Sequence, residues 1–62
     1  MKIRFIGTSD KDFTYGKEYK LLNIQINDNF AILWTVDNNN KITSIPYMSL
    51  TFLNENWEVV DE

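Results

Sequence analysis

Apolar and polar residues alternate along several short runs of this chain with the period of a β-strand. The first run, residues 2–7, alternates basic with apolar residues and predicts a half-buried strand with a basic outer face. The second run, 17–26, is mostly apolar, and its alternation slips at Leu21 and Leu22, which predicts a bulge or a strong bend. The third run, 30–36, is apolar on both faces and predicts a central strand rather than an edge strand.

Two further segments towards the C-terminus also favour strands. Residues 41–45 predict a strand that ends at Pro46, because proline donates no backbone hydrogen bond to a ladder. Residues 46–49 are too few for an α-helix and suit a single 3₁₀ turn. Residues 51–60 predict a bent strand or two short strands, because polar residues 54–56 interrupt the apolar ones.

Turn chemistry separates these runs. Residues 8–16 are mostly polar, end at a glycine and predict a long loop, and the asparagine-rich stretches 27–29 and 37–40 predict tight turns. No run of about ten residues repeats with the helical period. Five short strands without a covering helix must close on themselves to hide their edges and their core. The sequence therefore predicts an all-β fold, a small and partly open five-stranded barrel, in one domain over residues 1–62.

Composition excludes most catalytic chemistry. The 62 residues include no cysteine and no histidine, which rules out disulfides, structural zinc sites and mechanisms that use either residue. The only glycines, Gly7 and Gly16, form no phosphate-binding loop. We therefore expect a protein that is not an enzyme and that carries no cofactor and no metal.

Charge and hydropathy bear on the partner and the compartment. Six basic and nine acidic residues give a net charge of −3, which opposes generic nucleic-acid binding because such binding depends on neutralising phosphates. No apolar run approaches the roughly 20 residues of a membrane span. The N-terminus lacks the pattern of a signal peptide, so we expect a cytoplasmic protein without a membrane partner.

The order of these elements resembles the SH3-like barrel. In this resemblance residues 8–16 take the place of the long first loop, residues 37–40 the distal hairpin, and residues 46–49 the 3₁₀ turn before the last strand. The resemblance implies an SH3-like barrel over most of the chain.

A narrower resemblance rests on residues 13–21, Phe-Thr-Tyr-Gly-Lys-Glu-Tyr-Lys-Leu. This stretch is similar to the threonine-x-glycine-lysine-x-tyrosine signature of small SH3-like proteins encoded by phages and prophages of Gram-positive bacteria. Residues 36–41 and then Phe52 resemble that family's later turn and C-terminal aromatic, although an asparagine stands where the family has a turn glycine. The resemblance implies a phage origin and no particular activity.

The chain has nine aromatic residues, more than a barrel of this size can bury, and aromatic residues are frequent anchors of interfaces. We therefore expect a non-enzymatic protein-binding module, a phage or prophage accessory protein that acts on a host or phage protein. The expected surface joins the first loop to the turn after residue 45, and it comprises Phe13, Tyr15, Pro46, Tyr47 and Met48. The same aromatic residues could instead line a polyproline groove, complete the core or form a homo-oligomer interface.

Charged residues leave further alternatives open. A basic face beside aromatic residues is typical of single-stranded nucleic-acid binding, and the candidates are Lys2, Arg4, Lys17 and Lys20. A plainer interpretation is that the basic first strand pairs with the acidic last strand. Asp10 and Asp12, with the C-terminal acidic residues, could also mimic nucleic acid in an inhibitor.

Two loops carry carboxylates at spacings used in metal sites. Asp10 and Asp12 are two residues apart, a spacing that occurs more often in solvated loops than in cation sites. The stretch that begins at Asp37 starts like a calcium loop, but Lys41 and Ile42 occupy its fifth and sixth positions, where a ligand and a glycine are required. We interpret it as a hairpin turn.

Overall fold

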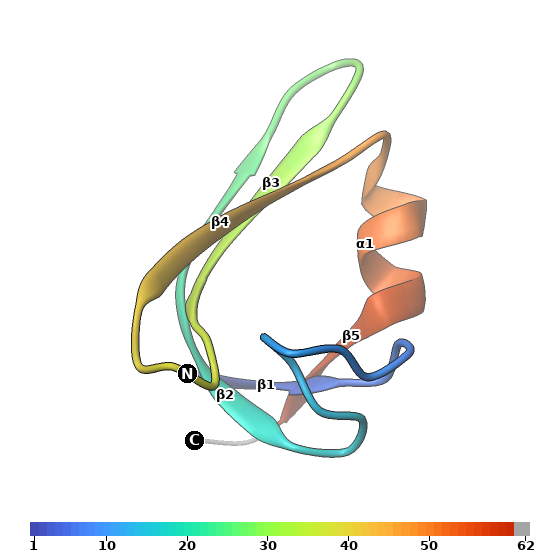
Figure 1. The fold of residues 1–62 in the computed structure, drawn as a ribbon. Helices are drawn as coiled ribbons and strands as arrows, with labels where there is room; N and C mark the ends of the chain where they lie inside the picture. The colour runs from blue at the N-terminus through green and yellow to red at the C-terminus, as the bar shows by residue number, and fades with distance from the viewer. Residues whose placement is uncertain (61–62) are drawn as a thin grey trace.

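The computed structural model describes residues 1–60, which form one antiparallel sheet of five strands and one short helix (Figure 1). The elements are β1 (Lys2–Phe5), β2 (Glu18–Ile26), β3 (Ala31–Val36), β4 (Ile42–Tyr47), α1 (Leu50–Asn56) and β5 (Trp57–Val60). The strands lie in the order β4-β3-β2-β1-β5, so the first and last strands of the chain are neighbours, as the sequence predicts. No helix among the described residues is long and apolar enough to cross a membrane. The acidic tail at residues 61–62 lies outside the described residues.

The bulge predicted in β2 is confirmed. The register of β2 with β3 shifts between Leu21, which pairs with Thr35, and Asn23, which pairs with Trp34. Side chains alternate between the two faces of a strand, so an unbroken β2 would turn Ile24 outwards. The extra residue at the shift keeps Leu21 and Ile24 both packed against the core. The predicted central position of β3 is also confirmed, because it lies between β2 and β4.

The expected five strands are confirmed, and over residues 1–60 the sheet is not closed, with β4 and β5 as its two edges. The expected end of the fourth strand at Pro46 is wrong, because Pro46 lies inside β4 opposite Ile32. The N–H of Asp37 donates to the carbonyl of Lys41 (2.9 Å), and bonded pairs alternate along an antiparallel ladder. Counted from that pair, the nitrogen of Pro46 faces away from β3. A proline in this edge strand therefore costs no ladder hydrogen bond.

The helix α1 replaces the strand expected in the first part of residues 51–60, and no 3₁₀ turn precedes it. Ser49 caps its first turn, with its hydroxyl accepting from the N–H of Phe52 (3.4 Å), and the N–H of Trp57 bonds to the carbonyl of Leu53 where the helix ends. Leu53 is its only buried residue. Seven residues span two turns, which is too short for a helical period to stand out in the sequence.

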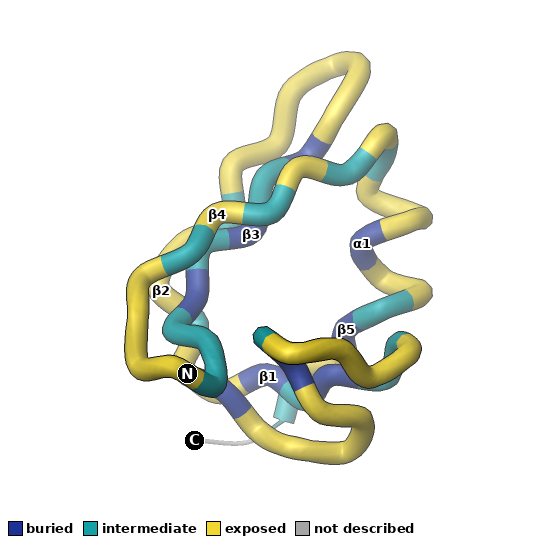
Figure 2. The backbone as a smooth tube through the Cα atoms, viewed as in Figure 1, coloured by how far each residue is buried: buried dark blue, intermediate teal, exposed yellow. Residues whose placement is uncertain are grey.

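The core centres on four aromatic rings, which we call the four-ring cluster: Phe5, Phe13, Tyr19 and Trp57. Their contacting pairs have ring centroids 5.0–5.7 Å apart, in tilted or edge-to-face geometry. Buried residues alternate with more exposed ones along β1 and β3, so one face of each strand packs on this core (Figure 2). The Tyr19 hydroxyl accepts from the N–H of Thr14 (2.7 Å).

The β3–β4 turn is organised by Asp37. One of its carboxylate oxygens accepts from the N–H groups of Asn39 (2.8 Å) and Lys41 (3.0 Å), and the other accepts from the Thr43 hydroxyl (2.8 Å). These hydrogen bonds, first that from Lys41, hold the pKa of Asp37 below its ordinary value. Asn40 has a φ of 61°, which fits the positive φ expected of this asparagine-rich turn.

We expect Tyr19→Phe to lower the free energy of unfolding by about 1–3 kcal/mol, because it removes a buried hydroxyl that both accepts and donates a hydrogen bond. Urea denaturation followed by tryptophan fluorescence measures the change. Tyr15→Phe is the matched control, since the Tyr15 ring is 67% exposed, and a change within about 0.5 kcal/mol is expected there. Equal effects of the two substitutions would contradict the prediction.

We expect Asp37→Asn to destabilise the protein at neutral pH and to have a smaller effect in acid. A carboxyl whose pKa is lower in the folded chain stabilises the fold above its unfolded pKa of about 3.9, and this contribution is lost as the pH falls through the folded pKa. Urea midpoints of the wild type and the variant should therefore begin to converge as the pH falls below about 5 and should continue to converge as it falls through the folded pKa of Asp37. Asp28→Asn, the same charge change in the β2–β3 turn, supplies the comparison.

Candidate functional site

The structure brings together only two of the five residues expected to form the protein-binding surface. Phe13 and Tyr47 line one pocket, although Phe13 is only 5% exposed and belongs to the core. Tyr15 lies in the loop between β1 and β2, the first loop, and Met48 lies between β4 and α1; Figure 1 places these two connections at opposite ends of the molecule. Pro46 is exposed, and strand alternation turns it to the opposite face from Tyr47.

The pocket that contains Phe13 and Tyr47 has a volume of about 400 Å³, and we call it the first-loop pocket. The first loop and β4 both contribute to it, across the open side of the sheet (Figure 1). Phe5 adds a third aromatic ring to its lining, and Asp10 and Asp12 contribute its only charged side chains. It therefore combines aromatic and acidic groups.

Asn38 ties the first loop to the β3–β4 turn. Its backbone N–H donates to the carbonyl of Asp12 (2.8 Å), and its side-chain amide donates to the hydroxyl of Thr14 (3.2 Å). Its side-chain oxygen accepts from the hydroxyl of Tyr19 (2.7 Å) and from Lys17 Nζ (3.0 Å). Sequence reasoning identified Asn38 only as a turn residue, because nothing local indicates that the first loop lies against this turn.

The two carboxylates of the pocket are held in place by the loop. One oxygen of Asp10 accepts from the N–H groups of Asp12 (2.8 Å) and Phe13 (2.9 Å), and one oxygen of Asp12 accepts from the side-chain amide of Asn39 (3.2 Å). The other oxygen of each carboxylate bonds to no group within residues 1–60. Over the same range no group of three or more metal-ligating side chains forms.

The pKa of the Tyr47 hydroxyl depends on burial, on a hydrogen bond and on a charge in this pocket. Burial raises the pKa of its hydroxyl above the ordinary value, and the hydrogen bond that it accepts from Trp57 Nε1 (2.8 Å) opposes that rise. The negative charge of Asp10 raises the pKa of Tyr47 further. The Asp10 carboxylate therefore acts on the hydroxyl of Tyr47, which lines the same pocket.

A second cavity of about 290 Å³ lies between the end of β2, α1 and β5, and we call it the α1 groove. It is lined almost wholly by apolar side chains, and sequence reasoning did not find it. Val59 pairs with buried Ile3, and Ile26 pairs with buried Ala31, so both side chains face the inner side of the sheet. Val59 is nevertheless 66% exposed and Ile26 60% exposed, because no described element covers the sheet there.

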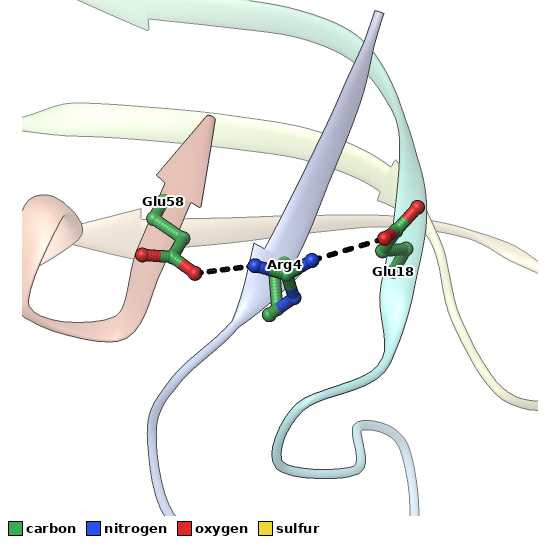
Figure 3. Close-up of polar contacts among 3 residues, drawn as sticks. All are labelled: Arg4, Glu18 and Glu58. Atoms are coloured by element: carbon green, nitrogen blue, oxygen red, sulfur yellow. Dashed lines mark hydrogen bonds and ion pairs between the residues drawn. The ribbon is translucent and has the colours of Figure 1, made fainter. Parts of the chain in front are cut away.

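Some of the basic residues proposed to bind nucleic acid form ion pairs or hydrogen bonds with other side chains of the protein. Arg4 bridges Glu18 (3.1 Å) on β2 and Glu58 (2.8 Å) on β5 (Figure 3), and these hydrogen bonds, first that to Glu58, raise the pKa of Arg4. The predicted pairing of the basic first strand with the acidic last strand is thus confirmed for Arg4 and Glu58. Lys2 and Lys20 lie opposite each other on β1 and β2. The structure therefore leaves a small lysine pair rather than a continuous basic face.

The sequence matches no protein-family model and no curated protein, and the fold matches no solved structure.

We expect Asp10→Asn to lower the pKa of the Tyr47 hydroxyl, because the substitution removes the negative charge that raises it. Absorbance of tyrosinate during an alkaline titration measures the change, and the same titration of Tyr47→Phe assigns the transition. Asp28→Asn is the matched control for the loss of one negative charge. An unchanged pKa in Asp10→Asn would mean that this carboxylate does not act on Tyr47.

Proposed function

We propose that this protein is a non-enzymatic binding module whose α1 groove holds an extended apolar segment of another protein. The observation that supports this proposal is the exposure of Val59 and Ile26 on the inner side of the sheet. Side chains on that side normally pack into a core, and full burial of one such side chain is worth about 1.5–3 kcal/mol. A partner segment would supply the cover that the described chain lacks.

The edge of β5 favours an extended segment over a helix. The N–H of Ile6 donates to the carbonyl of Asn56 (2.8 Å), and bonded pairs alternate along the β1–β5 ladder. Counted from that pair, the N–H and carbonyl of Val59 point away from β1, at the open edge of the sheet. An added strand could bond to these groups and place alternate side chains against the groove, which is the chemistry of β-augmentation.

Acidic residues near β5 indicate which type of residue would flank the apolar part of the bound segment. Between residues 42 and 60 the sequence has no lysine or arginine but has Glu55 and Glu58. Glu58 pairs with Arg4, whereas Glu55 has no basic neighbour in the sequence. We therefore propose that the segment is apolar at alternate positions and carries basic residues at its flanks.

The proposed class of function, a protein-binding module, is the one expected from the sequence. The proposed surface is the α1 groove instead of the expected surface at the first loop. Two aromatic residues outside the core support the new surface. Phe30 and Phe52 are 41% and 47% exposed and lie in or beside the elements that border the α1 groove. Met48, between β4 and α1, is the one residue of the expected set that lies in a connection to α1.

We further propose that the chain is a variant SH3-like barrel of the kind encoded by phages and prophages of Gram-positive bacteria, acting in the host cytoplasm. The long first loop, the β2 bulge and the tight β3–β4 hairpin support this kinship. In this interpretation α1 stands where the family has its 3₁₀ turn.

The test is selection of binding peptides from a displayed library of extended ten-residue segments, followed by affinity measurements on variants. We expect Val59→Pro to weaken the selected peptides by about tenfold or more, because it removes the edge N–H without disturbing the β1–β5 ladder. Ser44→Pro is the matched control. Ser44 lies two residues before Pro46 in β4, and its N–H also faces outwards from an edge strand. Its effect should stay within about twofold.

Other outcomes would replace the proposal. Peptides that bind Val59→Pro and the wild type equally would show that the edge of β5 is not used. A concentration-dependent dimer in sedimentation that Val59→Pro abolishes would make a second copy of this chain the occupant. Saturable binding of single-stranded DNA or RNA in low salt, lost on substitution of Lys2 and Lys20, would favour the nucleic-acid alternative.

A further inference from the structure

The first-loop pocket is a second cavity: it shares no lining residue with the α1 groove, although β1 and α1 contribute residues to both. Its volume of about 400 Å³ lies within the range of roughly 300–1,000 Å³ that is usual for small-ligand sites. Its two charged lining groups, Asp10 and Asp12, are both carboxylates, and no lysine or arginine lines it. A group that enters this pocket therefore meets negative charge only.

The two carboxylates are positioned before any ligand binds. The hydrogen bonds from Asp12, Phe13 and Asn39 use one oxygen of each carboxylate and fix its direction. The remaining oxygen of each is an acceptor with no partner in residues 1–60. Preorganised acceptors of this kind bind a donor with little loss of conformational entropy.

The rest of the pocket lining combines apolar side chains with three uncharged polar ones. Phe5 and Phe13 are buried rings, Ile45 and Tyr47 are half-buried, and all four line the pocket. The apolar side chains suit a hydrocarbon stem, and aromatic rings also attract a cation that lies near them. The pocket thus presents charged acceptors at one part of its surface and apolar contacts at another.

We infer that the first-loop pocket binds a primary alkylammonium group, whose N–H donors bond to Asp10 and Asp12 and whose methylene stem packs on Phe5, Phe13 and Tyr47. A calcium ion fits less well, because it takes six to eight oxygen ligands and no group of three or more metal-ligating side chains forms within residues 1–60. A quaternary ammonium ion has no N–H donor and would leave both carboxylate oxygens unbonded. A lysine side chain and a free diamine share the required chemistry.

Titration of ¹⁵N-labelled protein followed by NMR tests this inference with four probes. n-Butylammonium should cause saturable shifts in the first loop and β4. 1-Butanol, which has the same stem without the charge, and tetramethylammonium, which has the charge without donors, should each bind about tenfold or more weakly. An N-acetyl-lysine amide compared with 1,4-diaminobutane then distinguishes a protein lysine from a free amine as the source.

The double variant Asp10→Asn with Asp12→Asn removes both charges and keeps the side-chain oxygens that accept the loop hydrogen bonds, so the loop should keep its conformation. We expect n-butylammonium to bind this variant about tenfold or more weakly. Asp28→Asn, in the β2–β3 turn, should change the affinity by less than about twofold. Val59→Pro should leave it unchanged, which separates this site from the α1 groove.

Three results would overturn the inference. The first is the absence of saturable shifts in wild-type protein. The second is equal binding of 1-butanol and n-butylammonium, which would make the pocket a merely apolar site. The third is an equal loss in Asp28→Asn, which would indicate attraction to the net charge of the chain rather than to two placed carboxylates. The comparison of probes on wild-type protein decides the question even if the double variant does not fold.

Discussion

Contact among four aromatic rings holds this structure together. The sheet is open, so no ladder of hydrogen bonds joins its two edges, and without cysteine or histidine the chain has no disulfide or zinc site to do so. The four-ring cluster takes that role because its rings come from β1, the first loop, β2 and β5. Its two polar rings also reach the β3–β4 half: the Tyr19 hydroxyl donates to Asn38, and Trp57 Nε1 donates to Tyr47. Each bond satisfies a donor on a buried residue while it joins distant parts of the sheet.

The strand order leaves β4 and β5 as the two edges of the sheet within residues 1–60. Helix α1 connects these two edge strands in the chain. Different groups then line the two cavities. The first loop contributes Asp10 and Asp12 to one, whereas β2, α1 and β5 contribute apolar side chains to the other. Residues of β1 and α1 line both cavities, so the two candidate sites share elements but no residue.

The features that the sequence predicted correctly are those that local patterns determine. Alternation located the strands, the slip at Leu21 and Leu22 located the bulge, and asparagine located the β3–β4 turn. The short helix α1 was not predicted, because its cap and its one buried leucine leave almost no periodic signal in the sequence. Pro46 was misjudged because the direction of a strand nitrogen depends on register and on which strands are edges. The exposure of Val59 was not predicted for the same reason, because it follows from the position of β5 at the edge of the sheet and not from neighbouring residues in the sequence. Phe13 and Tyr47 were found as aromatic residues, but their shared pocket depends on the tie through Asn38.

The distribution of charge gives the net value of −3 a structural meaning. On the outer face Arg4 bridges Glu18 and Glu58, and its positive charge offsets one of their two negative charges. Asp10 and Asp12 have no such basic partner within residues 1–60 and keep an oxygen available beside aromatic rings. Charges separated by more than about 8–10 Å are largely screened at physiological salt, so only groups placed at contact distance can select a ligand. A marginal domain that leaves inner-facing valine and isoleucine uncovered also forgoes stability that a small core needs. Such local departures from optimal packing and pairing are typical of functional or strained sites.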